Sequence, residues 1–220
     1  RHRSARSPDR RAVVGRELEY AVKTLGMLGT MVATDPVNQD IATEKMEPLW
    51  AMAEALDVPV VLHPPTHGFG SAIKPVYLTY TLGRTLDTTI TAAKLIFNGL
   101  FDRHPKLKMV LVHGGGYLPY QIGRIDHSYA GGQARPKVLQ RGRPSAYLPL
   151  MYYDTVAMSP EAIRLMRDIA GAERIMLGSD FVWSAGEEPI TETVEHAKFT
   201  PAEVECIFCK NARQLFLKES

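Results

Sequence analysis

Histidine and aspartate side chains follow each of five predicted strands, at the point where the strand ends. In chain order these residues are Asp35, His63, His113, Asp154 and Asp180. The carboxyl ends of parallel strands meet at one edge of an α/β fold, so we expect these side chains to converge. Imidazole nitrogens and carboxylate oxygens suit a divalent metal ion of borderline softness, usually zinc, whose bound water titrates at about pH 7. The pattern therefore predicts a zinc site that activates water.

Each of these residues taken alone has a simpler interpretation. An aspartate after a strand commonly caps a turn, and a single histidine is more often a hydrogen-bonded structural residue than a metal ligand. His67 follows His63 in a Pro/Gly-rich loop and is interpreted as a surface residue rather than a further ligand. Turn formation alone does not explain five such side chains at one edge, which favours the metal site.

The segment after His113 holds two further features that a site could use. Three consecutive glycines, 114–116, let the backbone pack closely beneath a substrate, and the GxxxxGK[ST] pattern of a phosphate loop is absent. Arg124 lies eleven residues beyond His113 on a predicted helix. A guanidinium there can bind a carboxylate through two hydrogen bonds, or it can be a solvated charge on the helix surface. The spacing leaves both roles open for Arg124.

Strands and helices alternate along the chain and would position these side chains. Short runs rich in Val, Ile or Leu predict strands, and apolar residues at spacings of three and four predict helices. The predicted strands span residues 30–33, 58–62, 108–112, 150–153 and 174–177. The predicted helices span residues 16–25, 43–56, 76–100, 118–129, 160–169 and 201–217, with Ser159 and Thr200 as N-caps. This alternation predicts parallel βαβ units with right-handed crossovers.

Two α/β architectures fit five such units. One is an open doubly wound sheet, and the other is a (β/α)₈ TIM barrel of which the chain holds only about the last five βα units. An eight-stranded barrel typically takes about 250 residues, whereas the chain has 220 residues. Five strands do not close such a barrel, so the sequence predicts an open sheet or a partial barrel.

The composition is that of a soluble globular protein, with 45% hydrophobic and 23% charged residues. The net charge of +2 does not indicate a nucleic-acid-binding protein, and no apolar run approaches the roughly 20 residues that cross a membrane. Two cysteines do not make a disulfide scaffold, so we expect a reducing, cytoplasmic location. Residues 1–16 carry six arginines and one aspartate, and we expect them to form a basic, irregular N-terminal extension.

Four short motifs resemble, in order and spacing, those of one enzyme family. They are His-Pro at residue 63, HGGG-x-x-P-x-x-x-G-R over residues 113–124, YYDT over residues 152–155 and LGSD over residues 177–180. They resemble the amidohydrolase-related family of the amidohydrolase superfamily, in particular its branch like aminocarboxymuconate-semialdehyde decarboxylase. The resemblance implies a metal-dependent hydrolase-type (β/α)₈ barrel with one divalent metal ion, usually Zn²⁺.

The resemblance also implies roles for individual residues. His63 matches a metal-binding histidine and Asp180 matches a metal-binding aspartate. His113 matches the histidine that contacts the metal-bound water and acts as general acid/base. Arg124 matches an arginine that reaches a neighbouring subunit's active site and holds a carboxylate of the substrate, which implies a homodimer.

One departure from the family pattern concerns the metal ligands. The family's first strand carries His-x-His, two more ligands, and the nearest string here, at residues 1–3, has one histidine. We therefore expect the first three barrel strands to be missing and residues 17–220 to form a partial barrel domain. The sequence does not identify what replaces the missing ligands.

Three hypotheses for function remain open at this point. The first is a metal-dependent decarboxylase, a carbon–carbon lyase, of a small unsaturated or aromatic carboxylic acid, with metal-activated water and His113 as acid/base. The second is a metal-dependent hydrolase of an ester, lactone or amide on the same fold. The third is a catalytically incomplete fragment, whose open sheet edges and apolar inner face would promote association. The HGGG motif and Arg124 favour the decarboxylase, with a small carboxylate and a second copy of the chain as partners.

Overall fold

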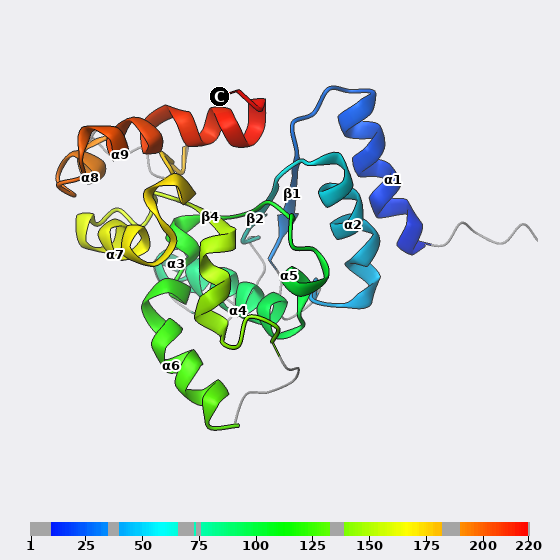
Figure 1. Ribbon diagram of the computed structural model, residues 1–220, viewed down its shortest axis with the longest axis horizontal. Helices are drawn as coiled ribbons and strands as arrows, with labels where there is room; N and C mark the ends of the chain where they lie inside the picture. Colours follow the sequence, from blue (N-terminus) through cyan, green and yellow to red (C-terminus); the bar gives the residue numbers. More distant parts are fainter. Residues whose placement is uncertain are drawn as a thin grey trace, which may run out of the picture.

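The computed structural model describes residues 10–34, 40–65, 73, 76–132, 139–181 and 190–219 (Figure 1). Asp35 and His67 lie outside the described residues. In the part of the chain that is described, no helix combines the length and the apolar character that a membrane-spanning segment needs.

Five parallel strands form one sheet in the order β1-β2-β3-β4-β5. They are β1 (Thr30–Ala33), β2 (Val60–His63), β3 (Met109–Leu111), β4 (Met151–Asp154) and β5 (Ile175–Met176). Strands that are neighbours in the sheet are therefore consecutive in the chain. A doubly wound sheet would reverse its order at a switch point. The arrangement is that of part of a (β/α) barrel and confirms the partial-barrel prediction.

Helices precede and link the strands. The segments up to β3 are α1 (Arg10–Lys23), the 3₁₀ turn η1 (Glu44–Met46), α2 (Glu47–Leu56), α3 (Val76–Leu78), the π-helical turn η3 (Thr79–Gly83), α4 (Arg84–Phe97) and α5 (Leu100–Arg103). Those from β3 to β5 are η4 (His113–Gly115), α6 (Leu118–Ala130), η5 (Pro144–Leu150), α7 (Pro160–Ala170) and η6 (Ala172–Arg174). Short helix α8 (Glu192–Glu195) follows β5. The side chain of Ser159 caps α7, as the sequence predicts.

Helix α1 begins earlier than the sequence predicts, because residues 10–16 are helical rather than irregular. Arginine and alanine are good helix formers, which explains the earlier start. Within this stretch Gly15 lies so close to α2 that a Cβ there would stand 2.7 Å from the backbone oxygen of Pro48. Part of the basic segment expected to be an extension therefore packs on the domain.

Side chains along the strands alternate between the two faces of the sheet. One face carries the main hydrophobic core, which the helices between the strands complete. Its largest fully buried members include Trp50 of α2, Phe101 of α5 and Tyr153 of β4, together with Leu62, Met109 and Leu111. His63, next to Leu62, points from the other face, so the strand geometry separates the packed core from the site.

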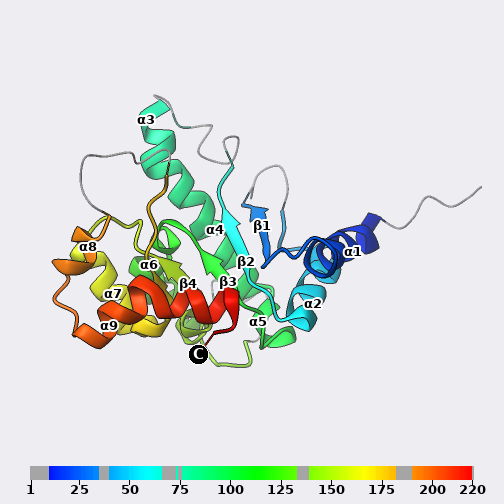
Figure 2. The same cartoon turned by 90° about the horizontal axis from the view of Figure 1, so that it is seen from above.

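The last helix covers part of that second face. It runs from α9 (Pro201–Glu205), capped by Thr200 as predicted, through the π-helical turns η7 (Cys206–Lys210) and η8 (Arg213–Leu217). Leu215 is buried against Val110 and Met176, and Figure 2 shows this helix lying across the sheet. The buried Asn211 fixes it to the sheet by donating hydrogen bonds to the carbonyl oxygens of Ala172 and Ile175. The inner face, which the fragment hypothesis expects to be open, is thus partly covered.

Candidate metal centre and its pocket

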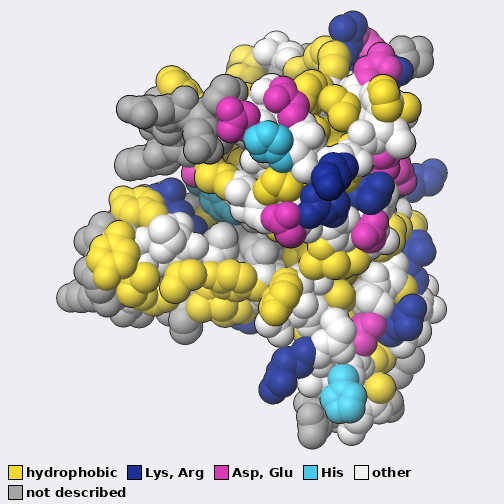
Figure 3. Space-filling model, turned by 90° about the vertical axis from the view of Figure 1, so that its left-hand side faces the viewer, with side chains coloured by type: hydrophobic (Ala, Val, Ile, Leu, Met, Phe, Trp, Pro, Cys, Tyr) yellow, Lys and Arg dark blue, Asp and Glu magenta, His cyan; other side chains and the backbone are white. Residues whose placement is uncertain are grey.

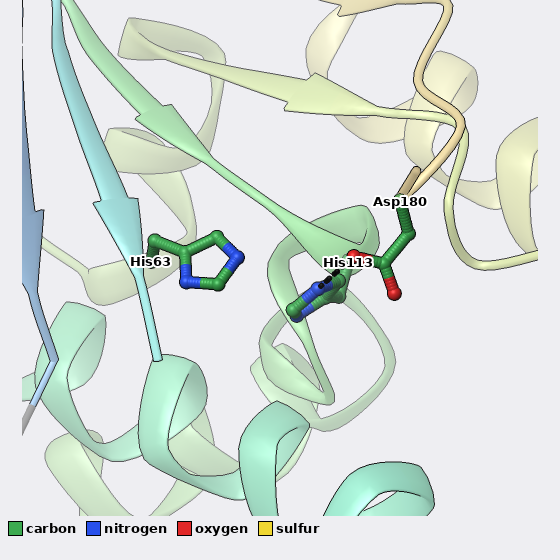
Figure 4. A group of neighbouring side chains, drawn as sticks. All are labelled: His63, His113 and Asp180. Atoms are coloured by element: carbon green, nitrogen blue, oxygen red, sulfur yellow. Dashed lines mark ion pairs between the residues drawn. The ribbon is translucent and has the colours of Figure 1, made fainter. Parts of the chain in front are cut away.

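His63, His113 and Asp180 come together at the carboxyl end of the sheet (Figure 4). His63 is the last residue of β2, His113 begins the turn after β3, and Asp180 follows β5. One possible ligand atom from each residue lies within 4.8 Å of the other two. The two imidazole rings stand edge to face, with centroids 5.5 Å apart. The structure therefore brings together three of the five residues that the strand pattern selects.

His113 and Asp180 form the closest charged contact of this group, with 3.6 Å between Nε2 and Oδ1. Burial lowers the pKa of the His113 imidazole below its usual value, and the neighbouring His63 and Arg84 act in the same direction. The carboxylate of Asp180 opposes them and raises that pKa. Since burial has the largest effect, His113 is a neutral imidazole at neutral pH in the metal-free chain.

The hydrogen bond of His63 orients its ring. Its Nδ1 lies 2.9 Å from the carbonyl oxygen of Pro64. A carbonyl oxygen only accepts hydrogen bonds, so Nδ1 carries the proton and Nε2 keeps its lone pair. Metal-binding histidines are usually held in this way, with one ring nitrogen donating to a carbonyl or carboxylate and the other facing the ion.

Asp154 lies at the end of β4, as the sequence predicts, but its carboxylate binds the protein backbone. It accepts the N–H groups of His113 at 3.0 Å, Gly114 at 2.8 Å and Val156 at 3.0 Å. Burial raises the pKa of the Asp154 carboxyl to about 6, against the lowering effect of these N–H donors. His113 has a φ of 56°, a left-handed conformation that is uncommon for a residue with a Cβ. Asp154 therefore stabilises the turn that presents the His113 ring.

The glycines after His113 allow close packing of the protein against itself. Gly116 has a φ of 64°, and a Cβ at this position would collide with the backbone oxygen of Thr85 in α4. A Cβ on Gly115 would lie 2.9 Å from the ring of Tyr153. These contacts join the turn to α4 and β4, and the close packing beneath a substrate that the glycines suggest stays a prediction.

The chemistry of this side-chain group fits a divalent ion. Two imidazoles and one carboxylate are a donor set that catalytic zinc sites use, with a further position left for water or substrate. Nδ1 of His113 is buried without a hydrogen-bond partner, which is a costly state for a polar atom and leaves it available as a donor atom for an ion. The three residues thus have both the atoms and the proximity that a metal ion requires.

A cavity of about 520 Å³ opens beside His113 and Asp180. One wall is the helix that runs from α3 through η3 into α4, and the other is the segment after β4 that includes Val156 and Met158. In the space-filling view a notch opens next to a projecting group of apolar side chains, with histidine and basic side chains visible inside it (Figure 3). A small organic molecule can therefore reach His113 and Asp180, two of the three candidate ligands.

Arg124 lies on the exposed surface of α6 and is not among the described residues that line this cavity. The arginine that does line the cavity is Arg84, which is only 6% exposed. The sequence analysis missed Arg84, although a signal was present. Arg84 falls at helical spacing on the same stripe as Thr88, Thr91 and Leu95, all of them buried. A charged residue on a buried stripe is rarely buried without a partner or a function.

Comparisons with known proteins agree with this arrangement. A family model described as Amidohydrolase matches residues 6–217. A 2-amino-3-carboxymuconate-6-semialdehyde decarboxylase from Dictyostelium discoideum is 26% identical over 185 residues, which cover 83% of this chain and 51% of the relative. A gamma-resorcylate decarboxylase from Polaromonas sp. is 30% identical over 223 residues, covering 93% of this chain and 66% of the relative.

A solved structure is also similar. It is a dihydroxybenzoic acid decarboxylase from Polaromonas sp. with bound manganese and the inhibitor 2-nitroresorcinol. It is 28% identical with a TM-score of 0.76, and the match covers 94% of this chain and 66% of that one. The chain thus spans between about half and two thirds of the length of these relatives.

Proposed function

This chain belongs to the amidohydrolase family, and on that premise we propose that it is a metal-dependent decarboxylase of small aromatic or unsaturated carboxylic acids. The observation that carries the proposal is the convergence of His63, His113 and Asp180 beside a cavity at the carboxyl end of the sheet. The names of the relatives support the reaction class, since both curated relatives are decarboxylases.

His63 and Asp180 are the proposed ligands of one divalent ion. Zn²⁺ suits an imidazole and a carboxylate as ligands, and the manganese in the solved relative makes Mn²⁺ the second ion to test. A bound divalent ion supplies polarisation of substrate oxygens and lowers the pKa of a water ligand. The carbonyl of Pro64 orients His63, and the protein holds Asp180 at the same edge of the sheet.

His113 is the proposed acid/base. Decarboxylation replaces a carboxylate by hydrogen: the electrons of the breaking carbon–carbon bond stay on the substrate carbon, that carbon takes up a proton, and CO₂ leaves. Because its pKa is lowered, the His113 imidazole is neutral at rest, takes up a proton from solvent and donates it to that carbon. Asp180, 3.6 Å away, stabilises the imidazolium before the transfer.

Arg124 is proposed to act in a neighbouring copy of the chain. It is exposed on α6, so its guanidinium is accessible to a second molecule. In a homodimer it would hold a substrate carboxylate through two hydrogen bonds. Arg124→Lys keeps the charge and loses the planar fork, so weaker substrate binding at unchanged metal content is the expected result.

The experiment that tests the proposed function measures CO₂ release. The purified chain is loaded with Zn²⁺ or Mn²⁺, its metal content is determined by elemental mass spectrometry, and ¹³CO₂ is followed from hydroxybenzoic and unsaturated acids labelled at the carboxyl carbon. We expect about one ion per chain and turnover that His113→Ala abolishes, while His196→Ala, at an exposed histidine directly after α8, leaves it unchanged. Metal-loaded chain that releases no CO₂ from any acid overturns the proposal, as does release that His113→Ala does not alter.

A further inference from the structure

The helix wall of the cavity carries one arginine among aromatic and hydroxyl side chains. Tyr77, Tyr80, Thr81, Arg84 and Thr85 all line the cavity from this wall. Arg84 is the one permanent cation in the cavity lining, among the residues that the structure describes. His113 and Asp180 line the same space.

We propose that Arg84 binds a carboxylate of the substrate that the reaction retains, and so selects dicarboxylic acids for this site. The inference rests on the proposed function, because it concerns the same cavity and the same His113. It adds a contact from an arginine of the same chain to the one that the exposed Arg124 of a neighbouring copy is proposed to make with a substrate carboxylate.

The position of the guanidinium supports this role. Arg84 is 6% exposed, so an anion beside it interacts in a poorly solvated environment where charge–charge attraction is strong. Its guanidinium carbon lies 4.3 Å from the centroid of the Tyr80 ring, a contact that fixes the plane of the group. A guanidinium carries N–H donors in a planar fork, whose geometry matches the two oxygens of a carboxylate.

The charge of Arg84 also reaches the catalytic group. It lowers the pKa of His113, which places the two side chains within electrostatic range of each other. Two carboxylates belong to the same region: Asp180 lines the same cavity, and Asp87 is buried one turn further along α4. A carboxylate on Arg84 would therefore lie close to His113, with the rest of the substrate between them.

The reaction decides which carboxylate Arg84 can hold. A tight contact with the departing carboxylate would stabilise the substrate more than the transition state, in which that group becomes neutral CO₂, and would slow the reaction. A retained carboxylate keeps its charge throughout, so binding it lowers the Michaelis constant without this penalty. Tyr77 and Tyr80, which are 65% and 37% exposed, offer ring faces to a planar aromatic or conjugated acid.

The backbone conformation of the helix that lines the cavity also supports a functional role. The π-helical turn η3, residues Thr79–Gly83, ends directly before Arg84. Such turns are rare and are frequent at functional sites, because the extra residue changes the direction of the side chains that follow. This turn sets the direction of Tyr80 relative to Arg84.

The test compares binding of benzene-1,3-dicarboxylate with that of its uncharged analogue benzene-1,3-dicarboxamide, by isothermal titration calorimetry on the full chain, with and without Mn²⁺. Wild type should prefer the dicarboxylate, and Arg84→Gln should weaken dicarboxylate binding by about 10- to 100-fold while dicarboxamide binding changes less than about threefold. The control is Arg174→Gln, which removes a guanidinium 4.7 Å from the Tyr152 ring outside the cavity lining and should leave both affinities unchanged.

Equal loss of binding in both arginine variants, or dicarboxylate binding that Arg84→Gln does not weaken, overturns the inference. If Arg84→Gln does not fold, Arg84→Lys keeps the charge and the aliphatic stem, and it should still weaken dicarboxylate binding by about threefold or more. In turnover experiments Arg84→Gln should raise KM with kcat changed by less than about threefold. A fall in kcat at constant KM would overturn the assignment to a retained carboxylate.

The two proposals fail separately. Arg84-dependent binding of the dicarboxylate without CO₂ release overturns the decarboxylase and leaves Arg84 as a carboxylate-binding residue. CO₂ release that is independent of Arg84 leaves the decarboxylase and removes the inference.

Discussion

The carboxylate of Asp154 accepts the backbone N–H of His113 at 3.0 Å, so a side chain at the end of β4 holds the turn that follows β3. The same carboxylate accepts the N–H of Gly114 at 2.8 Å. Both of these residues have positive φ angles, and two hydrogen bonds to a charged acceptor offset the cost of that conformation.

Asp154→Asn should therefore destabilise the protein. An amide offers one oxygen in place of two, so at least one of the N–H groups of His113 and Gly114 meets an N–H₂ group instead of an acceptor. We expect a decrease of about 1–3 kcal/mol in the free energy of unfolding, measured by urea denaturation. Asp168→Asn, in an exposed ion pair with Arg167, should change it by less than about 1 kcal/mol. Equal stability of Asp154→Asn and wild type would refute the role of the carboxylate.

Gly116→Ala should also destabilise the protein, by more than about 2 kcal/mol. The φ of 64° disfavours a residue with a Cβ, and the added methyl group would collide with the backbone oxygen of Thr85. Gly123→Ala is the matched control, because no atom lies within 4 Å of a Cβ at this position in the interior of α6. It should stabilise the protein by about 0.5–1 kcal/mol through helix propensity. Thermal unfolding of both variants checks the prediction, and a melting temperature of Gly116→Ala at or above that of wild type would contradict it.

The His113 imidazole should titrate below 6.5 in the metal-free chain, because burial disfavours its charged form. Nuclear magnetic resonance of ¹⁵N-labelled histidine across a pH series measures the midpoint. Asp180→Asn should lower the midpoint further, since the Asp180 carboxylate stabilises the imidazolium. A wild-type midpoint above 6.5, or a higher midpoint in Asp180→Asn, would contradict the electrostatics of the site.

Glu47 should stabilise the fold at neutral pH and lose this effect in acid. Its carboxylate accepts hydrogen bonds from Arg103 at 3.1 Å and lies 2.8 Å from Nε2 of His104. Hydrogen bonding to Arg103 lowers the pKa of Glu47 from 4.5, so the contribution is full above that pH and disappears as pH falls through the lowered value. Since the side chain is 36% exposed, Glu47→Gln should cost only up to about 1 kcal/mol at pH 7.

The matched control for Glu47 is Glu195→Gln, at an exposed position of α8. Urea denaturation at pH 7 and pH 3 should give a stability difference between wild type and Glu47→Gln that shrinks in acid, and no comparable trend for Glu195→Gln. A stability difference between wild type and Glu47→Gln that grows as the pH falls would contradict the predicted pH dependence.

The sequence predicted the strand ends well because a short apolar run has few alternatives to a buried strand. The first strand has the predicted bounds, Thr30–Ala33, and His63 and His113 stand at the ends of β2 and β3 as expected. Parallel pairing then brings their side chains to one edge, so the convergence with Asp180 follows from topology. The same alternation left an open sheet and a partial barrel as alternatives, and the family resemblance implied the barrel.

The sequence pattern did not predict the contacts between different helices, strands and turns. The periodicity of α4 marks a buried stripe, but whether a residue on it meets the core or a cavity depends on what packs opposite, and Arg84 was missed for this reason. Asp154 was placed at the correct edge, yet its three N–H donors come from turns whose conformation the sequence does not specify. The helical state of residues 10–16 depends on packing against α2, as the contact between Gly15 and Pro48 indicates.

The π-helical turn Thr79–Gly83 has a consequence for how this protein can change through evolution. A π turn holds one residue more than an α turn, so deletion of a single residue there would restore regular α geometry. The helical residues just N-terminal to the deletion, including Tyr77, would then rotate by about 100° around the helix axis, while Arg84 and the strand ends would stay in place. The gain or loss of one codon can therefore change which side chains of this helix line the cavity, while His113 and Asp180 keep their positions. Such a change would alter which substrates the cavity accepts.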